Sequence, residues 1–487
     1  MTRTCRANVL EALTFRAREG CVAQVTCGFE SDGFPPGNAD LGCCVKTPRS
    51  SVCVSFKVIA ARHKSITSAR LQLGEFKVGR VSSWVCAASV LSVAAVAAAH
   101  SAQAGGFAVR EQSTSAQGSS FAGSAAGFDL SSMFWNPAAV TTKNGINTEA
   151  HAAIIIGDSH IDLDTPVPSG SGNIAQGALV PSSYFNYQLS DRLFLGMSIN
   201  SPFGLTTKPD NLDYLGSNFA LTSKLFTMNA APTVGYKLMP GVSVAAGVQV
   251  QYIKARLTSA PGGNLVTVKG DDVGFGFTAG VLLEPTASTK IGLGFRSSIA
   301  QKLDGTLTAP GQSTAITAEA DLPEIVTLSL RQAISPRLTF LGTVEWTNWS
   351  RVKELIFIDK ATGDQATINA LGDAPAGEAL NYEDGWFFSV GLEYQYNPVT
   401  LLRAGIAYEI SPIRTDEDRG FRIPDNDRIW LSIGTTYKWS DHISIDTAYT
   451  HIFVKDGGIE EDLGGTTFSG STQAHVDILS ASLKMKF

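Results

Sequence analysis

Apolar and polar side chains alternate in segments of about ten residues through most of this chain. In the clearest segment the apolar face carries Trp386, Phe388, Val390, Leu392, Tyr394 and Tyr396, against Phe387, Ser389, Gly391, Glu393 and Gln395. Residues 429–439 and 443–453 repeat the pattern, and each apolar face ends in aromatic side chains. An apolar face that ends in aromatic side chains is typical of the lipid-facing side of a membrane strand. The opposite face has small and polar side chains, which are typical of a barrel lumen. The pattern therefore predicts strands that span a membrane.

The connections between these segments alternate between short and long. Short turns are expected at 190–191, 239–241, 284–285, 335–336, 397–398 and 440–441. Long loops rich in Gly, Asp and Ser are expected near 159–176, 206–220, 258–270, 306–319, 357–382, 412–426 and 456–471. These turns and loops join about fourteen strands, and an even count places both termini in the periplasm. We therefore predict an all-β fold, a transmembrane antiparallel β-barrel over residues 146–487, in preference to a soluble β-sandwich, whose strands also alternate.

Composition divides the chain near residue 104. Residues 1–104 contain all seven Cys and 12 Lys and Arg against 6 Asp and Glu, a net charge of +6. Residues 105–487 contain no Cys and 26 Lys and Arg against 38 Asp and Glu, a net charge of −12. The acidic balance excludes nucleic acid as a partner, and the lack of Cys excludes a disulfide scaffold and Cys-ligated zinc.

Residues 77–104 have the three parts of a secretion signal peptide. A basic segment, 77–80, precedes an uncharged apolar run, 81–99, and Ala102-Gln103-Ala104 form an A-x-A cleavage site. We expect cleavage after Ala104. Because a signal peptide belongs at the N-terminus, we interpret residues 1–76 as a non-native or mis-assigned extension, with translation starting between Leu71 and Val78.

Residues 105–145 do not alternate and are rich in Ser, Gly and Ala. Small side chains suit packing inside a confined lumen, and the Phe134-Trp135 pair is costly to expose. We therefore predict that this segment is a hatch that plugs the barrel, rather than a disordered periplasmic tail. At the other end of the chain, residues 479–487 alternate up to a terminal Phe487, the assembly signal that outer-membrane strands present to the barrel-assembly machinery.

Several motifs resemble the FadL/TodX (OmpP1) family of outer membrane transporters for long-chain fatty acids and hydrocarbons. They are Gly106-Phe107, the small-residue run 119–127, Asn136-Pro137-Ala138, 201–206, 321–324, 344–350 and 422–430. The resemblance covers residues 105–487 in order, and residues 1–70 have no counterpart. It implies a monomeric fourteen-stranded barrel whose hatch gates passage through Asn136, Pro137 and Ala138.

The resemblance also implies a route for the cargo. A groove between outer loops would capture a hydrophobic molecule, which would leave laterally through a gap at a kink in the third strand. Ser201, Pro202, Phe203 and Gly204 fall where that kink is expected. Pro202 cannot donate a ladder hydrogen bond and Gly204 permits unusual backbone angles, although an ordinary strand end is the alternative.

Apolar side chains suited to the cargo are Phe107, Leu212, Tyr214, Leu215, Phe219 and Leu221. Each buried CH₂ of the cargo contributes about 0.8 kcal/mol. A fatty acid would also need a cation, and no residue stands out. Lys254 and Arg256 share a face with lipid-exposed side chains and are expected to snorkel to lipopolysaccharide, and Arg296 and Lys302 are further candidates. Fatty acid and neutral hydrocarbon therefore both stay open as cargo.

The sequence favours passive transport over the other functions considered. The histidines of residues 105–487 (His151, His160, His442, His451, His475) lie in no nucleophile motif, so we expect no enzyme. The acidic segments 416–418 and 425–427 lack EF-hand spacing, so we expect no metal and no cofactor. The alternative function is a general diffusion porin for hydrophilic solutes, whose lumen would be open. The expected partners are a hydrophobic small molecule and the lipid and lipopolysaccharide of the outer membrane.

Overall fold

The computed structural model describes residues 106–165, 169–368, 374–462 and 467–487, together with four short strands near the N-terminus. The chain divides into two units, Met1–Val81 and Ser82–Phe487. In the first unit β1 (Ala12–Arg16), β2 (Val22–Phe29), β3 (Ala39–Thr47) and β4 (Ser50–Val58) form an antiparallel sheet in that order. The predicted translation start, signal peptide and cleavage site lie outside the described residues.

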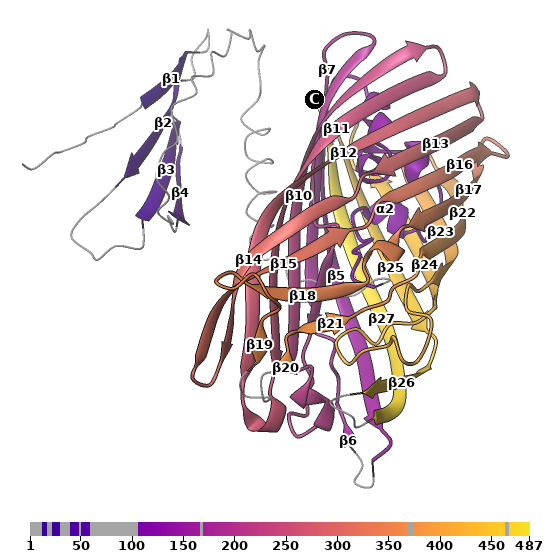
Figure 1. Cartoon of the computed structure of the whole chain (residues 1–487). Coiled ribbons are helices and arrows are strands. Elements are labelled where there is room, and N and C mark those ends of the chain that lie inside the picture. Colours follow the sequence, from indigo (N-terminus) through magenta and orange to yellow (C-terminus); the bar gives the residue numbers. More distant parts are fainter. Residues whose placement is uncertain are drawn as a thin grey trace, which may run out of the picture. The chain divides into compact units, whose positions relative to one another are not determined.

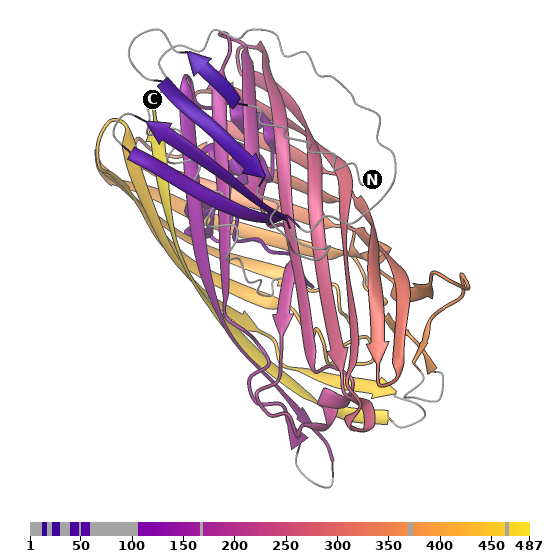
Figure 2. The same ribbon diagram turned by 90° about the vertical axis from the view of Figure 1, so that its left-hand side faces the viewer.

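The second unit is a closed antiparallel barrel, and fourteen spans run along the part of its wall that the structure describes (Figure 1). The spans are β5 (Ile146–Leu163), β7 (Ala178–Gln188), β8 (Leu193–Asn200) with β9 (Gly204–Thr207), β10 (Thr222–Met239), β11 (Val242–Ser259), β12 (Val266–Thr286), β13 (Thr289–Arg296) with β14 (Ile299–Ala309), β15 (Gln312–Leu322) with β16 (Ile325–Ala333), β17 (Leu338–Thr347) with β18 (Glu354–Asp359), β22 (Gly385–Asn397), β23 (Thr400–Ile410), β24 (Arg428–Lys438), β25 (Ile443–Val454) and β27 (Thr467–Lys486). The last span, β27, pairs with the first, β5, which closes the barrel (Figure 2). The predicted fourteen-stranded barrel is confirmed.

Short elements occupy the long connections. They are β6 (Ser169–Gly170), β19 (Thr367–Ile368), β20 (Ala374–Pro375), β21 (Gly377–Ala379), β26 (Gly457–Asp462), η4 (Leu215–Asn218), η5 (Pro261–Gly263) and η6 (Trp349–Arg351). Figure 1 shows β6, β19, β20 and β26 at the end of the barrel opposite the C-terminus. Long connections at one end and tight turns at the other are the arrangement of an outer-membrane barrel, with the loops outside the cell.

The apolar and polar positions that alternate in the sequence correspond to side chains that point outward and inward from the barrel wall. On β22 the side chains of Trp386, Val390 and Tyr396 point outward, with 39%, 48% and 61% of their surface exposed, whereas Phe387 is buried. Outward side chains on the neighbouring strands are equally apolar, so they form the band that faces lipid.

Several of the predicted long loops include five or more strand residues. Residues 159–163 belong to β5, residues 266–270 belong to β12, and residues 306–309 and 312–319 belong to a hairpin of β14 and β15 closed at 310–311. Residues 457–462 form β26, and residues 467–471 belong to β27. The predicted turn at 284–285 lies instead at 287–288. Where a strand continues beyond the lipid band, its outward side chains are polar. Its composition then resembles that of a loop, although its backbone stays paired in the sheet, and this is why the sequence predicted loops there.

Residues 106–141 fill the lumen, as predicted for the hatch. They form α2 (Thr114–Gln117), η1 (Ser124–Ala126), η2 (Leu130–Phe134) and η3 (Pro137–Thr141), and nearly every side chain is buried. Their hydrogen bonds reach strands all around the wall, for example Ser329 of β16, Ser432 of β24 and Ile478 of β27. No helix among the described residues is long and apolar enough to cross a membrane.

Candidate functional site

The motif Asn136-Pro137-Ala138 fastens the hatch to the wall. The side-chain amide of Asn136 donates to the carbonyl oxygens of Ala125 within the hatch (2.8 Å) and Val281 on β12 (2.9 Å). Its oxygen accepts from the amide of Ala138 at 3.0 Å and so caps η3, where Pro137 takes the first helical position. A single side chain therefore joins two turns of the hatch to the barrel.

Buried charges fasten other parts of the hatch. Arg110 pairs with Glu345 on β17 (2.5 Å) and Glu409 on β23 (3.2 Å) and stacks on the ring of Phe387. Asp129 pairs with Lys484 on β27 at 2.6 Å. Removing one partner of such a pair leaves a buried charge uncompensated, which costs several kcal/mol, about 3–5 in measured cases. These pairs therefore hold the hatch strongly in the closed position.

The third span breaks at the motif Ser201-Pro202-Phe203-Gly204. Between β8 and β9, residues 201–203 oppose only 227–228 of β10, so one extra residue bulges out of the ladder. On the other side, β8 pairs with β7 from Phe194 to Ile199, and residues 178–182 of β7 are paired with neither β8 nor β9 in the described sheet. A window in the wall therefore lies between β7 and the break.

The hatch fills this window. The amide of Val109 donates to the carbonyl of Pro202 (2.8 Å), and the amide of Gly204 donates to the carbonyl of Phe107 (2.8 Å), in the manner of a short inserted strand. Gln112 completes the closure, because its side-chain amide donates to the carbonyl of Ser201 at 2.7 Å. From β7, the hydroxyls of Ser182 (2.8 Å) and Tyr184 (2.9 Å) donate to the carbonyl of Gln112.

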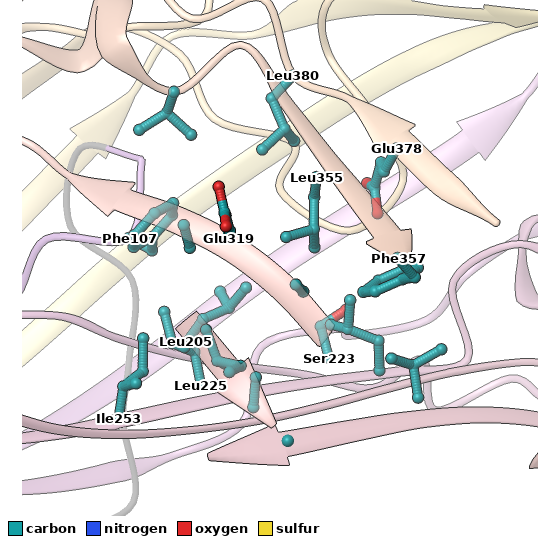
Figure 3. Close-up of a pocket in the computed structure, with 18 of the residues that line it drawn as sticks. Phe107, Leu205, Ser223, Leu225, Ile253, Glu319, Leu355, Phe357, Glu378 and Leu380 are labelled. Carbon is teal, nitrogen blue, oxygen red and sulfur yellow. The ribbon is translucent and has the colours of Figure 1, made fainter. Parts of the chain in front are cut away.

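A cavity of about 380 Å³ lies under the outer loops, against the concave faces of β10, β11, β12, β14, β15 and β18 (Figure 3). Most of its lining is apolar, including Phe107, Leu205, Leu225, Ile253, Leu303 and Ile316. Figure 3 shows the carboxylates of Glu319 and Glu378 among these side chains. A concave cavity with a mostly apolar surface and some polar groups is the usual form of a small-molecule site.

Aromatic rings close one side of the cavity. The ring of Phe107 packs against Trp349 with centroids 4.7 Å apart and against Phe203 with centroids 6.0 Å apart. Phe203 belongs to the broken third strand, and Trp349 belongs to η6. The cavity and the window in the wall therefore meet at Phe107.

The wall beside the cavity is also incompletely paired. β16 pairs with β17 up to Ile325, and β15 pairs with β18 only from Ile316 to Ala318. Residues 319–322 between these ladders line the cavity together with residues 351–355. The cavity therefore lies where the eighth and ninth spans separate.

The predicted substrate-binding residues do not form one site. Phe107 lines the cavity, whereas Tyr214 and Phe219 pack with Phe421 in a separate apolar cluster of the outer loops. Leu212 and Leu215 are exposed, and Leu221 is half-buried at the start of β10. Most cavity residues come from inward positions of strands, which the alternation identifies as luminal without showing which ones share a cavity.

The candidate cations lie apart from one another. Arg296 donates to the carbonyl of Phe134 at 3.1 Å and stacks on its ring, so it supports the hatch. Lys302 pairs with Glu319 at 3.3 Å, while Lys254 and Arg256 point outward, on the face predicted for them. Two cations that line the cavity have carboxylate partners: Arg422 pairs with Glu378 at 2.9 Å and Arg351 pairs with Glu324 at 3.0 Å.

The acidic segments and the histidines have structural partners. Asp425 pairs with Arg428 and accepts a hydrogen bond from the amide of Gly106 at 2.8 Å, so an outer loop holds the start of the hatch. His151 accepts a hydrogen bond from the amide of Thr114 at 3.1 Å. Among the described residues, no three or more acidic, His or Cys side chains are grouped so that they could hold a metal ion.

Comparison with known proteins agrees with this architecture. The model of the family described as outer membrane protein transport protein (OMPP1/FadL/TodX) matches residues 95–487. A long-chain fatty acid transport protein of Escherichia coli strain CFT073 is 26% identical over 82% of this chain and 98% of that relative. Outer membrane protein P1 of Haemophilus influenzae is also 26% identical, over 82% of this chain and 99% of that relative.

Solved structures share the fold. A Pseudomonas aeruginosa FadL homologue superposes with a TM-score of 0.71 at 23% identity, over 78% of this chain and all of the homologue. The Ralstonia pickettii toluene transporter TbuX superposes with a TM-score of 0.57 at 16% identity, over 78% of this chain and 99% of that chain.

Proposed function

Because the chain belongs to the outer membrane protein transport family OMPP1/FadL/TodX, we propose that it is a passive uptake channel for hydrophobic compounds. The observation that carries the proposal is the apolar cavity, which ends at the aromatic ring of Phe107 beside a hatch-filled window in the wall. Relatives named for long-chain fatty acids and for toluene define the range of cargo.

The cargo enters from the outer loops and is held in the cavity by its hydrocarbon part. Burial in this lining returns the transfer free energy of the alkyl chain, about 0.8 kcal/mol per CH₂, which a water-filled pore does not. Displacement of Phe107 then disturbs Phe203 and the hydrogen bond to Gly204, so the window beside Ser201 opens. Release through the window delivers the cargo sideways rather than through the hatch.

The charges of the cavity bear on the choice of cargo. Lys353 donates to the carbonyl of Tyr382 at 3.0 Å, and Arg422 is held by Glu378 at 2.9 Å. A carboxylate cargo has to displace these partners and approach Glu378, whereas a neutral hydrocarbon does not. We expect an alkylbenzene to bind at least as tightly as a fatty-acid anion of equal carbon number.

Uptake of a radiolabelled alkylbenzene and a labelled fatty acid by a deletion strain tests the function. Ile316→Gln places an amide in the cavity and should reduce uptake about tenfold, since an unpaired buried amide costs about 1–3 kcal/mol. Ala315→Gln is the matched control, because its side chain is exposed on the other face of the same strand. Equal uptake by the two variants would contradict the proposal.

Planar-bilayer recording separates this function from a general porin. A closed hatch should give little steady ion current, whereas a porin would conduct continuously. A large current from the wild-type protein would favour the porin.

We further propose that Phe487 is the signal read by the barrel-assembly machinery and that the channel is a monomer. The amide of Phe487 donates to the carbonyl of Ile146 at 2.9 Å, so the terminal residue lies at the seam where the barrel closes. Phe487→Ala should lower the amount of assembled protein in the outer membrane, as measured by heat-modifiable gel mobility, without changing uptake per assembled molecule.

A further inference from the structure

A row of cations crosses three adjacent strands on the outer face of the barrel. Lys224 on β10 lies opposite Arg256 on β11, and Arg256 lies opposite Lys269 on β12. Residues directly opposite in an antiparallel ladder point to the same face, with Cβ atoms about 4.5–5.5 Å apart. Lys254 lies two residues below Arg256 on the same face, and both side chains are exposed.

The four cations of this row outnumber the carboxylate that faces them, Asp271. None of its four members forms an ion pair or a side-chain hydrogen bond within the part of the chain that the structure describes. Asp271 faces Lys254 in register without pairing to it, and Asp304 is engaged by Lys360 at 2.8 Å. Like charges directly opposite one another in a sheet are destabilising, so the row is a site where an anion relieves repulsion.

Some outward cations of the barrel are paired and provide a comparison for the row. Lys290 pairs with Glu284 at 2.8 Å, Lys302 pairs with Glu319 at 3.3 Å, and Lys438 pairs with Asp441 at 2.9 Å. What distinguishes the cationic row is that its members lie opposite one another in register on three adjacent strands.

The height of the row identifies the anion. On β11 the lipid-facing positions run through Val248 and Val250 to Tyr252, and Lys254 follows directly. At about 3.4 Å per residue, Lys254 and Arg256 lie about 7 Å and 14 Å beyond Tyr252 along the tilted strand. The polar headgroup layer begins at the edge of the hydrocarbon core, so the row stands at headgroup level on the outer side.

We propose that the cationic row, Lys224, Lys254, Arg256 and Lys269, binds the phosphate groups of lipopolysaccharide in the outer leaflet. Guanidinium and ammonium groups are suited to phosphate, and the apolar strands below supply the surface for the acyl chains. Phe275 and Phe277 on β12, with 67% and 53% of their surface exposed, form part of that surface.

Native mass spectrometry of the full-length protein tests the site, with three probes: bisphosphorylated lipid A, the same lipid A without phosphates, and inorganic phosphate. The variant carries Lys224→Gln, Arg256→Gln and Lys269→Gln. The control carries Lys290→Gln, Lys302→Gln and Lys438→Gln, which removes the same charge from paired positions. Heat-modifiable gel mobility verifies that each protein is folded.

We expect bisphosphorylated lipid A to bind the variant about a hundredfold more weakly than the wild type, with the control unchanged. If the triple variant does not fold, Arg256→Gln alone should weaken binding about fivefold. Equal binding to lipid A without phosphates, or an equal loss in the control, would overturn the proposal. Inorganic phosphate that binds as tightly as lipid A would show a free-phosphate site instead and would also overturn it.

Discussion

The amide of Gly204 donates a hydrogen bond to the carbonyl of Phe107 over 2.8 Å. Phe107 is part of the cavity lining, and Gly204 begins β9 above the break in the third span. The cavity and the window in the wall are therefore parts of one hydrogen-bonded unit. A cargo molecule that moves Phe107 acts directly on the strand beside the window.

Replacing Gln112 by Ala should loosen the window. The substitution leaves the carbonyls of Ser201 and Val109 without their donor, at a cost of about 1–3 kcal/mol for the buried groups. Hydrogen exchange of residues 106–112 should increase, and bilayer recordings should show brief openings. Gln473→Ala, on the outward face of β27, is the control and should change neither measurement. Unchanged exchange in the Gln112 variant would show that the window does not depend on this side chain.

The two roles of Asn136 can be separated by substitution. Asn136→Ala removes the cap of η3 and the donor to Ala125 and Val281, whereas Asn136→Asp keeps the capping oxygen but buries a carboxylate against those two carbonyl oxygens. We expect Asp to destabilise the hatch more than Ala, because an uncompensated buried charge costs about 3–5 kcal/mol and the lost cap about 1 kcal/mol. Protease cleavage within the hatch of the folded barrel measures this. Slower cleavage of the Asp variant than of the Ala variant would mean that the cap outweighs the buried charge.

Gly294 marks a point where the hatch backbone touches the wall. A Cβ added there would overlap the carbonyl oxygen of Trp135, a backbone atom that cannot turn aside. Gly294→Ala should therefore displace the hatch and raise the ion conductance of an assembled barrel, at a cost of about 1–3 kcal/mol. Gly342→Ala is the matched control, since a Cβ added there would meet the ring of Phe340 at an ordinary contact distance of 3.8 Å. Low conductance in both variants would argue against this contact as the seal.

The outer loops should loosen as pH rises through neutrality. Burial, with Glu378 nearby, raises the pKa of Glu461 to about 7 from an ordinary value of 4.5. Because the pKa is raised in the folded state, folding favours the neutral acid. Glu461 therefore contributes its full stabilisation of the folded loops below pH 4.5, and this contribution is lost as pH rises through 7. The protection factor of the Phe421 amide, which donates to Glu461, should decrease over that range; it compares the exchange rate with that of an unstructured peptide at the same pH.

Glu461→Gln should abolish this pH dependence, because the amide cannot ionise. Glu460→Gln, on an exposed neighbouring side chain, should retain it. If the protection factor of Phe421 falls equally with pH in the Glu461 variant, another group is responsible.

The sequence by itself determined the barrel, its lipid-facing band and the presence of a plug. Side chains of a strand alternate between two environments, so the order Trp386, Phe387, Phe388 already records which faces lipid and which the lumen. Motifs around Asn136 and Pro202 also placed the hatch contact and the strand break, because Asn caps and Pro interruptions act locally.

The tertiary structure alone decided the cavity, the closure of the window and the cationic row. Gln112 and Ser201 are 89 positions apart, and Lys224, Arg256 and Lys269 meet through the register of three strands. Tyr214 and Phe219 are predicted as cargo contacts because they are apolar in a loop, and only the tertiary structure shows that they pack with Phe421. Alternation along a strand specifies which face of the wall a residue lies on. It does not specify which residue lies beside it on the next strand or across the lumen, because strand register and the packing of the hatch determine those neighbours.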